Sequence, residues 1–259
     1  MNIIADTHIH FYPCYDLKSA IVNLRSNLAN IGSDCLNLAF LAERFDCHYF
    51  QELKIKKEEI PASSFKIRNF GEALLLEEQG YQDLFLFAGR QVITRERLEI
   101  LALTTDMKIP DGLPVHTVID RINEAGAIAV LSWAPGKWFG ERGKRVARLL
   151  KDYSANELLL GDTTLRPWCW FEPLLMKKAV KSGFTVLAGS DPLPFAGEEK
   201  MMGRYVSGWK MEFDLHDPVG SVRNYLKESG KCLQRLGRRG YCIETFRRLY
   251  KNMKTKKTA

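Results

Sequence analysis

Long hydrophobic runs are absent from the sequence. No window of the 259 residues approaches the about 20 consecutive apolar residues that a membrane-spanning helix needs. The first residues also lack the charged segment followed by an apolar segment that marks a secretory signal peptide. These absences argue against a membrane partner and lead us to predict a cytoplasmic protein. With 46% hydrophobic residues, the chain is long enough to bury the core of one large domain.

Paired cysteine motifs are absent as well. The six cysteines are scattered, and no two of them form a Cys-x-x-Cys pair. This spacing argues against a zinc ribbon, and it argues against a disulfide scaffold in a chain of this length. We therefore expect reduced thiols at all six positions, which are Cys14, Cys35, Cys47, Cys169, Cys232 and Cys242.

Acidic residues are scarce at the C-terminal end, which carries most of the positive charge. Residues 231–259 contain ten lysines and arginines against the single acid Glu244, whereas the whole chain has a net charge of +7. Such an end is typical of a solvated helix with a frayed terminus, although it could also contact nucleic acid, an anionic membrane or an acidic partner. Aromatic and basic residues do not interleave here as in a strand-binding groove, so nucleic acid is unsupported as a partner.

Histidine is also scarce, and its distribution is informative. Two of the five histidines lie in the segment "IIADTHIHFYP", residues 3–13, directly after a short apolar run. If residues 2–6 form a strand, the alternation of side chains places Asp6, His8 and His10 on one face. Two imidazoles with this spacing can converge on a divalent cation, with the carboxylate fixing one ring from behind. The alternative is an ordinary strand whose polar end lies at the rim of a sheet, with the histidines bonded to backbone.

Short apolar runs alternate with longer amphipathic patterns along the chain. The apolar runs predict strands at 2–6, 36–42, 84–88, 98–103, 127–132, 157–161 and 185–189. The amphipathic patterns predict helices at 16–30, 112–125, 139–152 and 171–182. In "EAGAIAVLS" and "KSGFTVLAG", Gly126 and Gly183 follow a helix directly, as a left-handed helix end requires. Helix, glycine and strand in this order favour parallel strands with helical crossovers, as in an α/β barrel or a doubly wound sheet.

Polar residues gather after several of the predicted strands. In an α/β barrel the functional groups lie at the C-terminal ends of the strands. Asp191 follows the last predicted strand within "GSDPLPF", where an acid can act as a metal ligand or a general base beside His8 and His10. The alternative for Asp191 is a structural Asp-Pro turn.

The order of these segments resembles the polymerase and histidinol phosphatase (PHP) family of metal-dependent phosphoesterases. "ADTHIH" is similar to the opening His-x-His motif of that family, "AFLAER" to its "aiTDH" and "FAGRQVIT" to its "pGvEis". "EAGAIAVLSWAPG" resembles its "ggiavlAHPg", and "FTVLAGSDPLPF" resembles its closing "GSDaH". The resemblance implies an α/β fold, a distorted (β/α)7 TIM-like barrel, over residues 1–215. Residues 216–259 then form a basic helical extension that packs on the barrel or trails it.

The resemblance also implies a metal site, which this chain matches in part. His8 and His10 stand on the first two ligands of the family, and Asp191 stands on its late aspartate. Asp16 lies near a further ligand of the opening loop, and Glu43 offers a carboxylate on the aspartate of "TDH". Four other ligand positions are substituted, by Arg44, Gln91, Trp133 and Leu193.

These substitutions exclude a trinuclear centre, because an arginine adds positive charge where several dications need anionic ligands. The remaining set predicts one or two divalent metal ions, Mn, Zn or Fe, held by His8, His10, Asp16, Glu43 and Asp191. Asp191, Arg44 and Glu43 are the candidate catalytic residues, and Arg44 can bind an anionic oxygen through its planar fork. A surface ion pair is the alternative role for Arg44.

Three functional hypotheses remain open. The first is a metal-dependent hydrolase, acting on phosphate esters, with a small anionic or phosphorylated substrate. The second is a degenerate barrel that binds a ligand or partner without catalysis, in which Trp133 fills the place of lost metal. The third is an amidohydrolase-like enzyme for C–N or C–C bonds, since those enzymes also open with D-x-H-x-H. Because no lysine lies at a predicted strand end before residue 161 to serve as their metal-binding lysine, this hypothesis ranks last.

Overall fold

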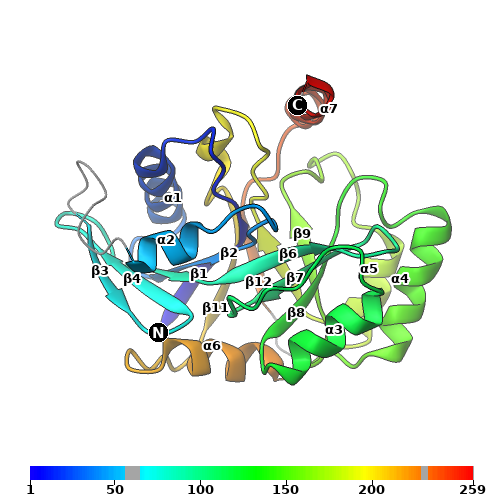
Figure 1. Ribbon diagram of the computed structural model, residues 1–259, viewed down its shortest axis with the longest axis horizontal. Coiled ribbons are helices and arrows are strands. Elements are labelled where there is room, and N and C mark those ends of the chain that lie inside the picture. The colour runs from blue at the N-terminus through cyan, green and yellow to red at the C-terminus, as the bar shows by residue number, and fades with distance from the viewer. Residues whose placement is uncertain (56–64, 229–232, 259) are drawn as a thin grey trace.

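Two mixed β-sheets form the centre of the computed structural model, which describes residues 1–55, 65–228 and 233–258 (Figure 1). The first sheet has seven strands, in the order β12 (Gln234–Gly237), β11 (Tyr205–Lys210), β1 (Asn2–Ile9), β2 (Leu36–Leu41), β5 (Leu84–Phe87), β4 (Ala73–Glu77) and β3 (Lys66–Asn69). The second has five, in the order β10 (Val186–Gly189), β9 (Leu159–Thr163), β8 (Ile128–Ser132), β7 (Glu99–Leu103) and β6 (Gly89–Ile93).

Helices cover the outer faces of both sheets. The first sheet is covered by α1 (Leu17–Ile31) and α2 (Tyr49–Ile55), and the second by α3 (Val115–Glu124), α4 (Gly140–Asp152) and α5 (Leu174–Lys181) (Figure 1). At one end of the molecule lies α6 (Pro218–Lys227), and at the opposite end lie the short 3-10 helix η1 (Glu198–Met201) and α7 (Cys242–Thr258). Among the helices that the structure describes, none combines the length and apolar content that crossing a membrane requires.

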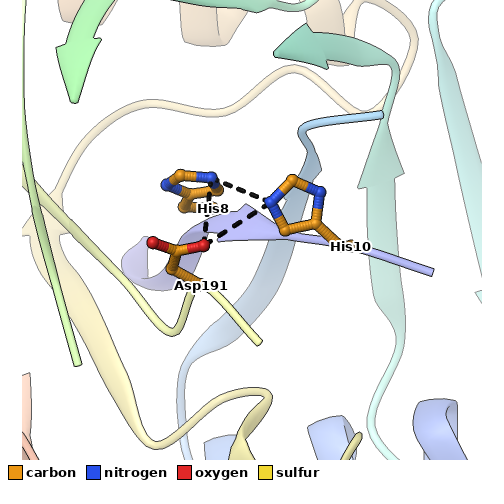
Figure 2. Close-up of side chains that lie close together, drawn as sticks. All are labelled: His8, His10 and Asp191. Carbon is orange, nitrogen blue, oxygen red and sulfur yellow. Dashed lines mark hydrogen bonds and ion pairs between the residues drawn. The ribbon is translucent and has the colours of Figure 1, made fainter. Parts of the chain in front are cut away.

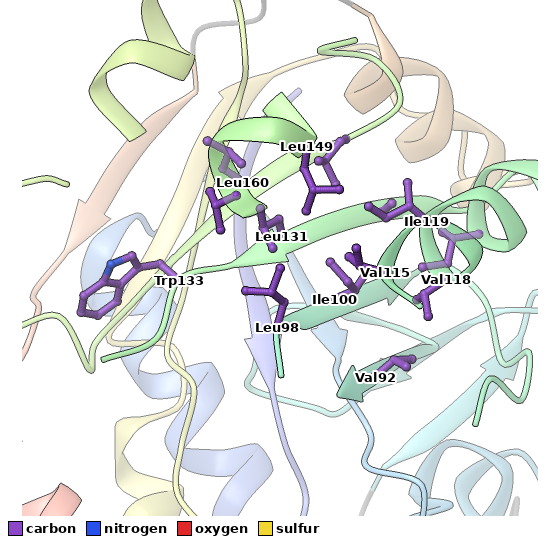
Figure 3. Packing of buried hydrophobic residues seen from close by; sticks show 14 of the residues in the cluster. Val92, Leu98, Ile100, Val115, Val118, Ile119, Leu131, Trp133, Leu149 and Leu160 are labelled. Carbon is purple, nitrogen blue, oxygen red and sulfur yellow. The ribbon is translucent and has the colours of Figure 1, made fainter. Parts of the chain in front are cut away.

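The apolar core has three parts, because most of the central strands are buried on both faces. Between the sheets, Phe40 and Phe87 of the first sheet pack in one cluster with Leu101 and Val130 of the second, and α6 covers one end of this layer. A second cluster lies between β7, β8 and β9 and the helices α3, α4 and α5 (Figure 3). A third lies between the first sheet and α1. The two sheets are therefore the inner layers of a single folded body.

The predicted (β/α)7 TIM-like barrel is wrong, because within the described residues no continuous ladder of backbone hydrogen bonds joins the two sheets. β10 lies beside β1 and β11, but side chains of these two strands bond to its backbone. Thr7 Oγ1 donates to Ala188 O over 3.0 Å, and Ala188 N donates to Ser207 Oγ over 2.8 Å. These two side chains satisfy the backbone at the edge of β10, in the place where a barrel would pair main chains. At the other junction the sheets meet through an isolated bridge between Glu43 and Arg90.

Strand directions also differ from those of an α/β barrel. β7 is antiparallel to both β6 and β8, and β1 is antiparallel to β11. The prediction for Gly126 and Gly183 is confirmed, because both have left-handed φ angles, of 69° and 90°. The chain leaving Gly183 enters β10, which pairs parallel with β9 as expected. The chain leaving Gly126 enters β8, whose antiparallel pairing with β7 contradicts the predicted crossover.

The seven predicted strands and four predicted helices are all present, with ends shifted by a few residues. The prediction omitted β3, β4, β6, β11, β12, α2 and η1. β12, which belongs to the region predicted as a helical extension, pairs with β11 at the edge of the first sheet. The division of the chain at residue 215 stays a prediction.

Cys169 and Cys242 form a disulfide, whereas we expected reduced thiols throughout. Folding brings together two cysteines that are 73 residues apart, which their spacing does not reveal. The disulfide ties the start of α7 to the loop after β9. α7 is also held by the buried Arg248, whose guanidinium pairs with Glu198 over 2.8 Å. Cys14, Cys35 and Cys47 are free, and Cys232 lies outside the described residues.

Candidate metal centre

Three buried side chains from distant parts of the chain meet at the junction of the two sheets. His8 lies near the end of β1, His10 directly follows it, and Asp191 follows β10. His8 Nε2 lies 3.0 Å from His10 Nε2, and Asp191 Oδ1 lies 3.7 Å from the former and 3.6 Å from the latter (Figure 2). The side chains point toward one another, and we call His8, His10 and Asp191 the triad.

Asp6 fixes the backbone that carries the triad. Its carboxylate accepts hydrogen bonds from the backbone N–H groups of His8, Ser190 and Gly203, over 3.2, 2.9 and 2.7 Å. Burial raises the pKa of Asp6 to about 6 in spite of these bonds. We expected this carboxylate to fix a histidine ring, but it binds main chain instead. The register of β1 against β2 shifts between Asp6 and Ile9, so the simple alternation of side chains does not hold there.

Two backbone features bring Asp191 up to the histidines. A Cβ atom on Gly189 would lie 2.4 Å from the Cβ of His8, so this close approach of β10 to β1 requires glycine. Asp191 has a left-handed φ of 47°, and its N–H donates to His8 O over 2.8 Å. Left-handed non-glycine residues persist where their surroundings hold them, and they cluster at functional sites.

The pKa shifts of His10 and Asp191 suit a bound cation. Burial lowers the pKa of His10, which keeps its imidazole neutral near pH 7. Burial acts on Asp191 in the opposite sense, but the facing imidazoles of His8 and His10 outweigh it and lower the pKa of Asp191. Neutral imidazole and ionised carboxylate are the forms that ligate metal ions.

The spacing of the donor atoms also fits a metal ion. A tetrahedral ion with bonds of about 2.0–2.1 Å separates its ligand atoms by about 3.3 Å. The three distances in the triad, from 3.0 to 3.7 Å, bracket that value. Both Nε2 atoms face the cluster, while neither Nδ1 atom has a hydrogen-bond partner among the described residues. The triad is therefore a candidate metal site, and two imidazoles with a carboxylate suit Mn, Zn and Fe alike.

The remaining predicted ligands lie outside the triad. Asp16 is exposed and caps α1, where its carboxylate accepts the N–H of Ser19 over 2.8 Å. Glu43 is buried, and its Oε1 accepts the N–H of Phe50 over 2.9 Å while Oε2 lies 3.8 Å from Arg90. Both carboxylates thus have structural partners of their own.

The positions at which we predicted that a metal ligand of the family is substituted lie in different parts of the structure. Gln91 joins the triad, because its Oε1 lies 3.1 Å from His8 Nε2. Leu193 lines the cavity beside the triad. Trp133 is fully buried in the core behind the second sheet (Figure 3) and is not among the residues lining that cavity. Its packing therefore gives no support to the hypothesis that Trp133 replaces a metal.

A cavity of about 620 Å³ opens at the triad and is lined by His10 and Asp191. Four cationic side chains also line it, namely Arg44, Arg97, Lys137 and Arg142. Lys137 pairs with Glu99, and Arg44 Nε lies 3.4 Å from Asp46. Arg44 thus forms the surface ion pair considered above and also faces the cavity. An anionic group is the ligand that these cations favour.

Arg97, Arg142 and Lys137 are cationic lining residues that the sequence interpretation missed. Arg97 lies in the turn between β6 and β7, and Arg142 lies in the first turn of α4. Arginines are common on turns and helices, so neither of these two positions carries a local signal. Gly189 was recoverable, because the glycine of "GSD" ends a predicted strand beside the histidine motif.

Replacing Glu43 by glutamine is expected to flatten the pH dependence of stability. Burial raises the pKa of Glu43 from its ordinary value of 4.5 to about 7, so the folded chain holds this proton more tightly than the unfolded chain. The stability of the wild type therefore falls as the pH rises through this window. Relative to Glu43→Gln, the loss between pH 5 and pH 8 should be about 2–3 kcal/mol, at about 1.4 kcal/mol per pKa unit. Urea unfolding at the two pH values measures it.

Glu52 on α2 provides the matched control, because it is an exposed glutamate close to Glu43. Glu52→Gln should retain most of the pH profile of the wild type, because burial is the largest cause that raises the pKa of Glu43 and the charge of Glu52 is a smaller one. Parallel profiles for Glu43→Gln and the wild type would contradict the assignment.

Comparison with known proteins shows likeness in structure alone. No family model matches the sequence, and no curated protein matches it significantly. The structure of PsfC from Pseudomonas syringae PB-5123 matches with a TM-score of 0.58 at 13% identity, over 99% of this chain and 98% of that one. The lesion-specific endonuclease PfuEndoQ from Pyrococcus furiosus matches with a TM-score of 0.50 at 14% identity, over 88% of this chain and 56% of that one. An endonuclease Q complex with a 27-mer duplex substrate matches at a TM-score of 0.47 and 15% identity, over 88% of this chain and 57% of that one.

The likenesses to PsfC and PfuEndoQ support a PHP-like fold, and in this chain its two sheets do not close into a barrel. They also correct the expectation that nucleic acid is unsupported as a partner, because a lesion-specific endonuclease shares the fold. The expectation overlooked α7, where helical periodicity interleaves exposed aromatic side chains with basic ones. Phe246 and Tyr250 are 72% and 52% exposed, with Arg247 and Lys251 beside them in the chain. The ligand substitutions relative to the PHP motifs stay predictions.

Proposed function

We propose that the chain is a metal-dependent hydrolase of phosphoesters and that its substrates are nucleic-acid strands. The observation that carries the proposal is the triad, in which two buried imidazoles and a carboxylate converge with the spacing of metal ligands. The cavity at the triad adds cationic side chains that suit a phosphate group. The same cavity therefore holds ligand atoms for a metal ion and basic side chains for a phosphate group. Phosphoester hydrolysis needs this combination.

The residues of the site divide into two sets. His8 Nε2, His10 Nε2 and the Asp191 carboxylate would hold the metal ion, and the amide oxygen of Gln91 is close enough to His8 to serve beside them. When bound, the ion supplies Lewis-acid activation of the phosphoryl group and of a water molecule. Arg44 and Lys137 orient the phosphate and offset its charge.

Two observations support a nucleic-acid strand as the substrate. The fold is shared with a lesion-specific endonuclease. Phe246 and Tyr250 of α7 are exposed one helical turn apart, and Leu249 of the same helix lines the cavity. Bases stack on exposed aromatic rings while cations bind the phosphates of the same strand. A strand that crosses α7 would then reach the triad.

Hydrolysis assays on the full chain test this function. The protein loaded with Mn, Zn or Fe should cleave bis(4-nitrophenyl) phosphate and a labelled single strand of 12 nucleotides, and EDTA should stop both reactions. Asp191→Asn should lower the rate by on the order of 100-fold, because the ion contributes several kcal/mol to the transition state. Asp34→Asn removes an exposed carboxylate that does not line the cavity and should keep the rate of the wild type. Cleavage of the ester without the strand would contradict the substrate class, and metal binding without any hydrolysis would contradict the enzyme.

A further inference from the structure

Arg97 adopts a backbone conformation that arginine rarely takes. Among the described residues, three that are not glycine have a left-handed φ, namely Arg97 at 61°, Thr104 at 63° and Asp191 at 47°. Asp191 belongs to the triad. Thr104 is held by Arg223, whose Nε lies 3.1 Å from Thr104 Oγ1. Arg97 shares the cavity with Asp191, and neither explanation applies to it.

The hairpin between β6 and β7 explains the backbone conformation of residue 97 but not why this residue is an arginine. Arg97 N donates to Thr94 O over 2.8 Å, and Thr94 N donates to Leu98 O over 2.9 Å. Such a turn needs a left-handed residue at position 97, where glycine or asparagine is usual. These are backbone bonds that any residue can make. The turn therefore gains nothing from an arginine and is strained by it.

The side chain of Arg97 is available for a ligand. It is exposed at the cavity, and within the described residues no hydrogen bond or ion pair engages its guanidinium. Arg142 reaches this cavity from α4; it is half-buried, and no hydrogen bond or ion pair engages its guanidinium among the described residues either. By contrast, Lys137 and Arg44 both have carboxylate partners. Two guanidinium groups without a partner thus line the cavity that holds the triad.

We infer, on the basis of the proposed function, that Arg97 binds the phosphate next to the one that lies at the triad. Arg142 supplies a second guanidinium for the same phosphate. The planar fork of arginine binds two oxygens of one phosphate. A nucleic-acid strand presents a phosphate at every nucleotide, whereas a simple monoester offers no second one. Arg97 therefore makes the site selective for strands over monoesters. The strained turn persists because its side chain serves the ligand rather than the fold.

Binding and stability measured on the same variants test this inference. A labelled single strand of 12 nucleotides is titrated by fluorescence anisotropy in EDTA, so that neither metal nor cleavage is involved. Arg97→Gly should weaken binding about tenfold and reduce the slope of log affinity against log salt by about 0.7, the value for one phosphate contact of a single strand. The affinity of Arg97→Lys should lie between those of the wild type and Arg97→Gly, because lysine keeps the charge but lacks the planar fork of arginine. Arg97→Gly should also raise the melting temperature by about 2–4 °C, because the left-handed position then carries no strain.

Arg95 supplies the matched control, since it lies in the same turn and does not line the cavity. Arg95→Ala removes the same charge from the same hairpin and should change the affinity less than twofold. Equal losses for Arg97→Gly and Arg95→Ala, a lower melting temperature for Arg97→Gly, or a wild type that binds no strand would each overturn the inference. Strand binding is measured without metal. A triad that takes up no metal would therefore contradict the proposed function but not the role of Arg97 in strand binding.

Discussion

The double variant His8→Ala with His10→Ala is expected to abolish stoichiometric metal binding. The two imidazoles supply two of the three donor groups of the triad, and one carboxylate alone cannot hold a transition metal against water. A site of micromolar affinity corresponds to about 8 kcal/mol of binding free energy. At a metal concentration 100 times the dissociation constant, the wild type should gain about 2.7 kcal/mol of stability, or about 5–10 °C in melting temperature. The double variant should gain none.

The measured quantity is the shift that metal causes in each protein, together with the metal content by elemental analysis. The absolute melting temperature is not used, because alanine at two buried histidines also leaves a cavity. Asp191→Asn should lose less, since its amide oxygen still coordinates without the charge. His48→Ala with His116→Ala removes two exposed imidazoles and should keep the wild-type shift. A wild type that takes up neither manganese nor zinc at large excess would remove the metal site altogether.

The features of this site that depend on residues close together in the chain could be predicted from the sequence. The apolar run and the spacing of His8 and His10 suffice to place both rings at the end of one strand. Asp191 could be placed near them because it follows the last predicted strand. The capping role of Asp16 was also predictable, since an aspartate directly before a helix is a usual N-cap residue, and its carboxylate accepts the N–H of Ser19. The resemblance to a distant motif outweighed this local signal.

Features that depend on long-range contacts could not be read in this way. The barrel fails to close because Thr7 and Ser207 bond to the backbone of Ala188, and these residues are about 180 and 20 positions away from it in the chain. Glu43 has an ordinary sequence context, and its burial beside Arg90 follows from how the two sheets meet. The left-handed Arg97 follows from the geometry of a hairpin whose sequence, "TRERL", contains no glycine.

A network of buried charged side chains links the two sheets at a junction where no continuous ladder of backbone hydrogen bonds joins them in the described residues. Asp162, fully buried on β9, accepts hydrogen bonds from Arg166 Nε over 2.7 Å and from Tyr205 of β11 over 2.8 Å. Arg166 Nη2 completes a two-point contact with the same carboxylate, and Arg235 of β12 lies 3.3 Å from it. β9 belongs to the second sheet, whereas β11 and β12 belong to the first. One carboxylate therefore joins three strands across the junction.

Asp162→Ala is accordingly expected to lower the free energy of unfolding by about 3–5 kcal/mol, because it leaves a buried charge without its partner. Arg166 is 3% exposed and has no carboxylate besides Asp162 within ion-pair distance in the described part of the chain. Arg235 retains Glu172, at 2.7 Å, so the uncompensated charge is that of Arg166. Urea unfolding followed by circular dichroism measures the loss.

Two further variants separate the network from a general effect of lost charge. Glu141→Ala breaks the exposed pair with Lys144 and should change stability by less than about 1 kcal/mol, as surface ion pairs do. Asp162→Ala with Arg166→Met should be more stable than Asp162→Ala alone, because the buried cation leaves together with its partner. If the double variant were the less stable of the two, the cost would lie in packing at β9 rather than in an unpaired charge, and the sheets would be fastened by their apolar layer alone.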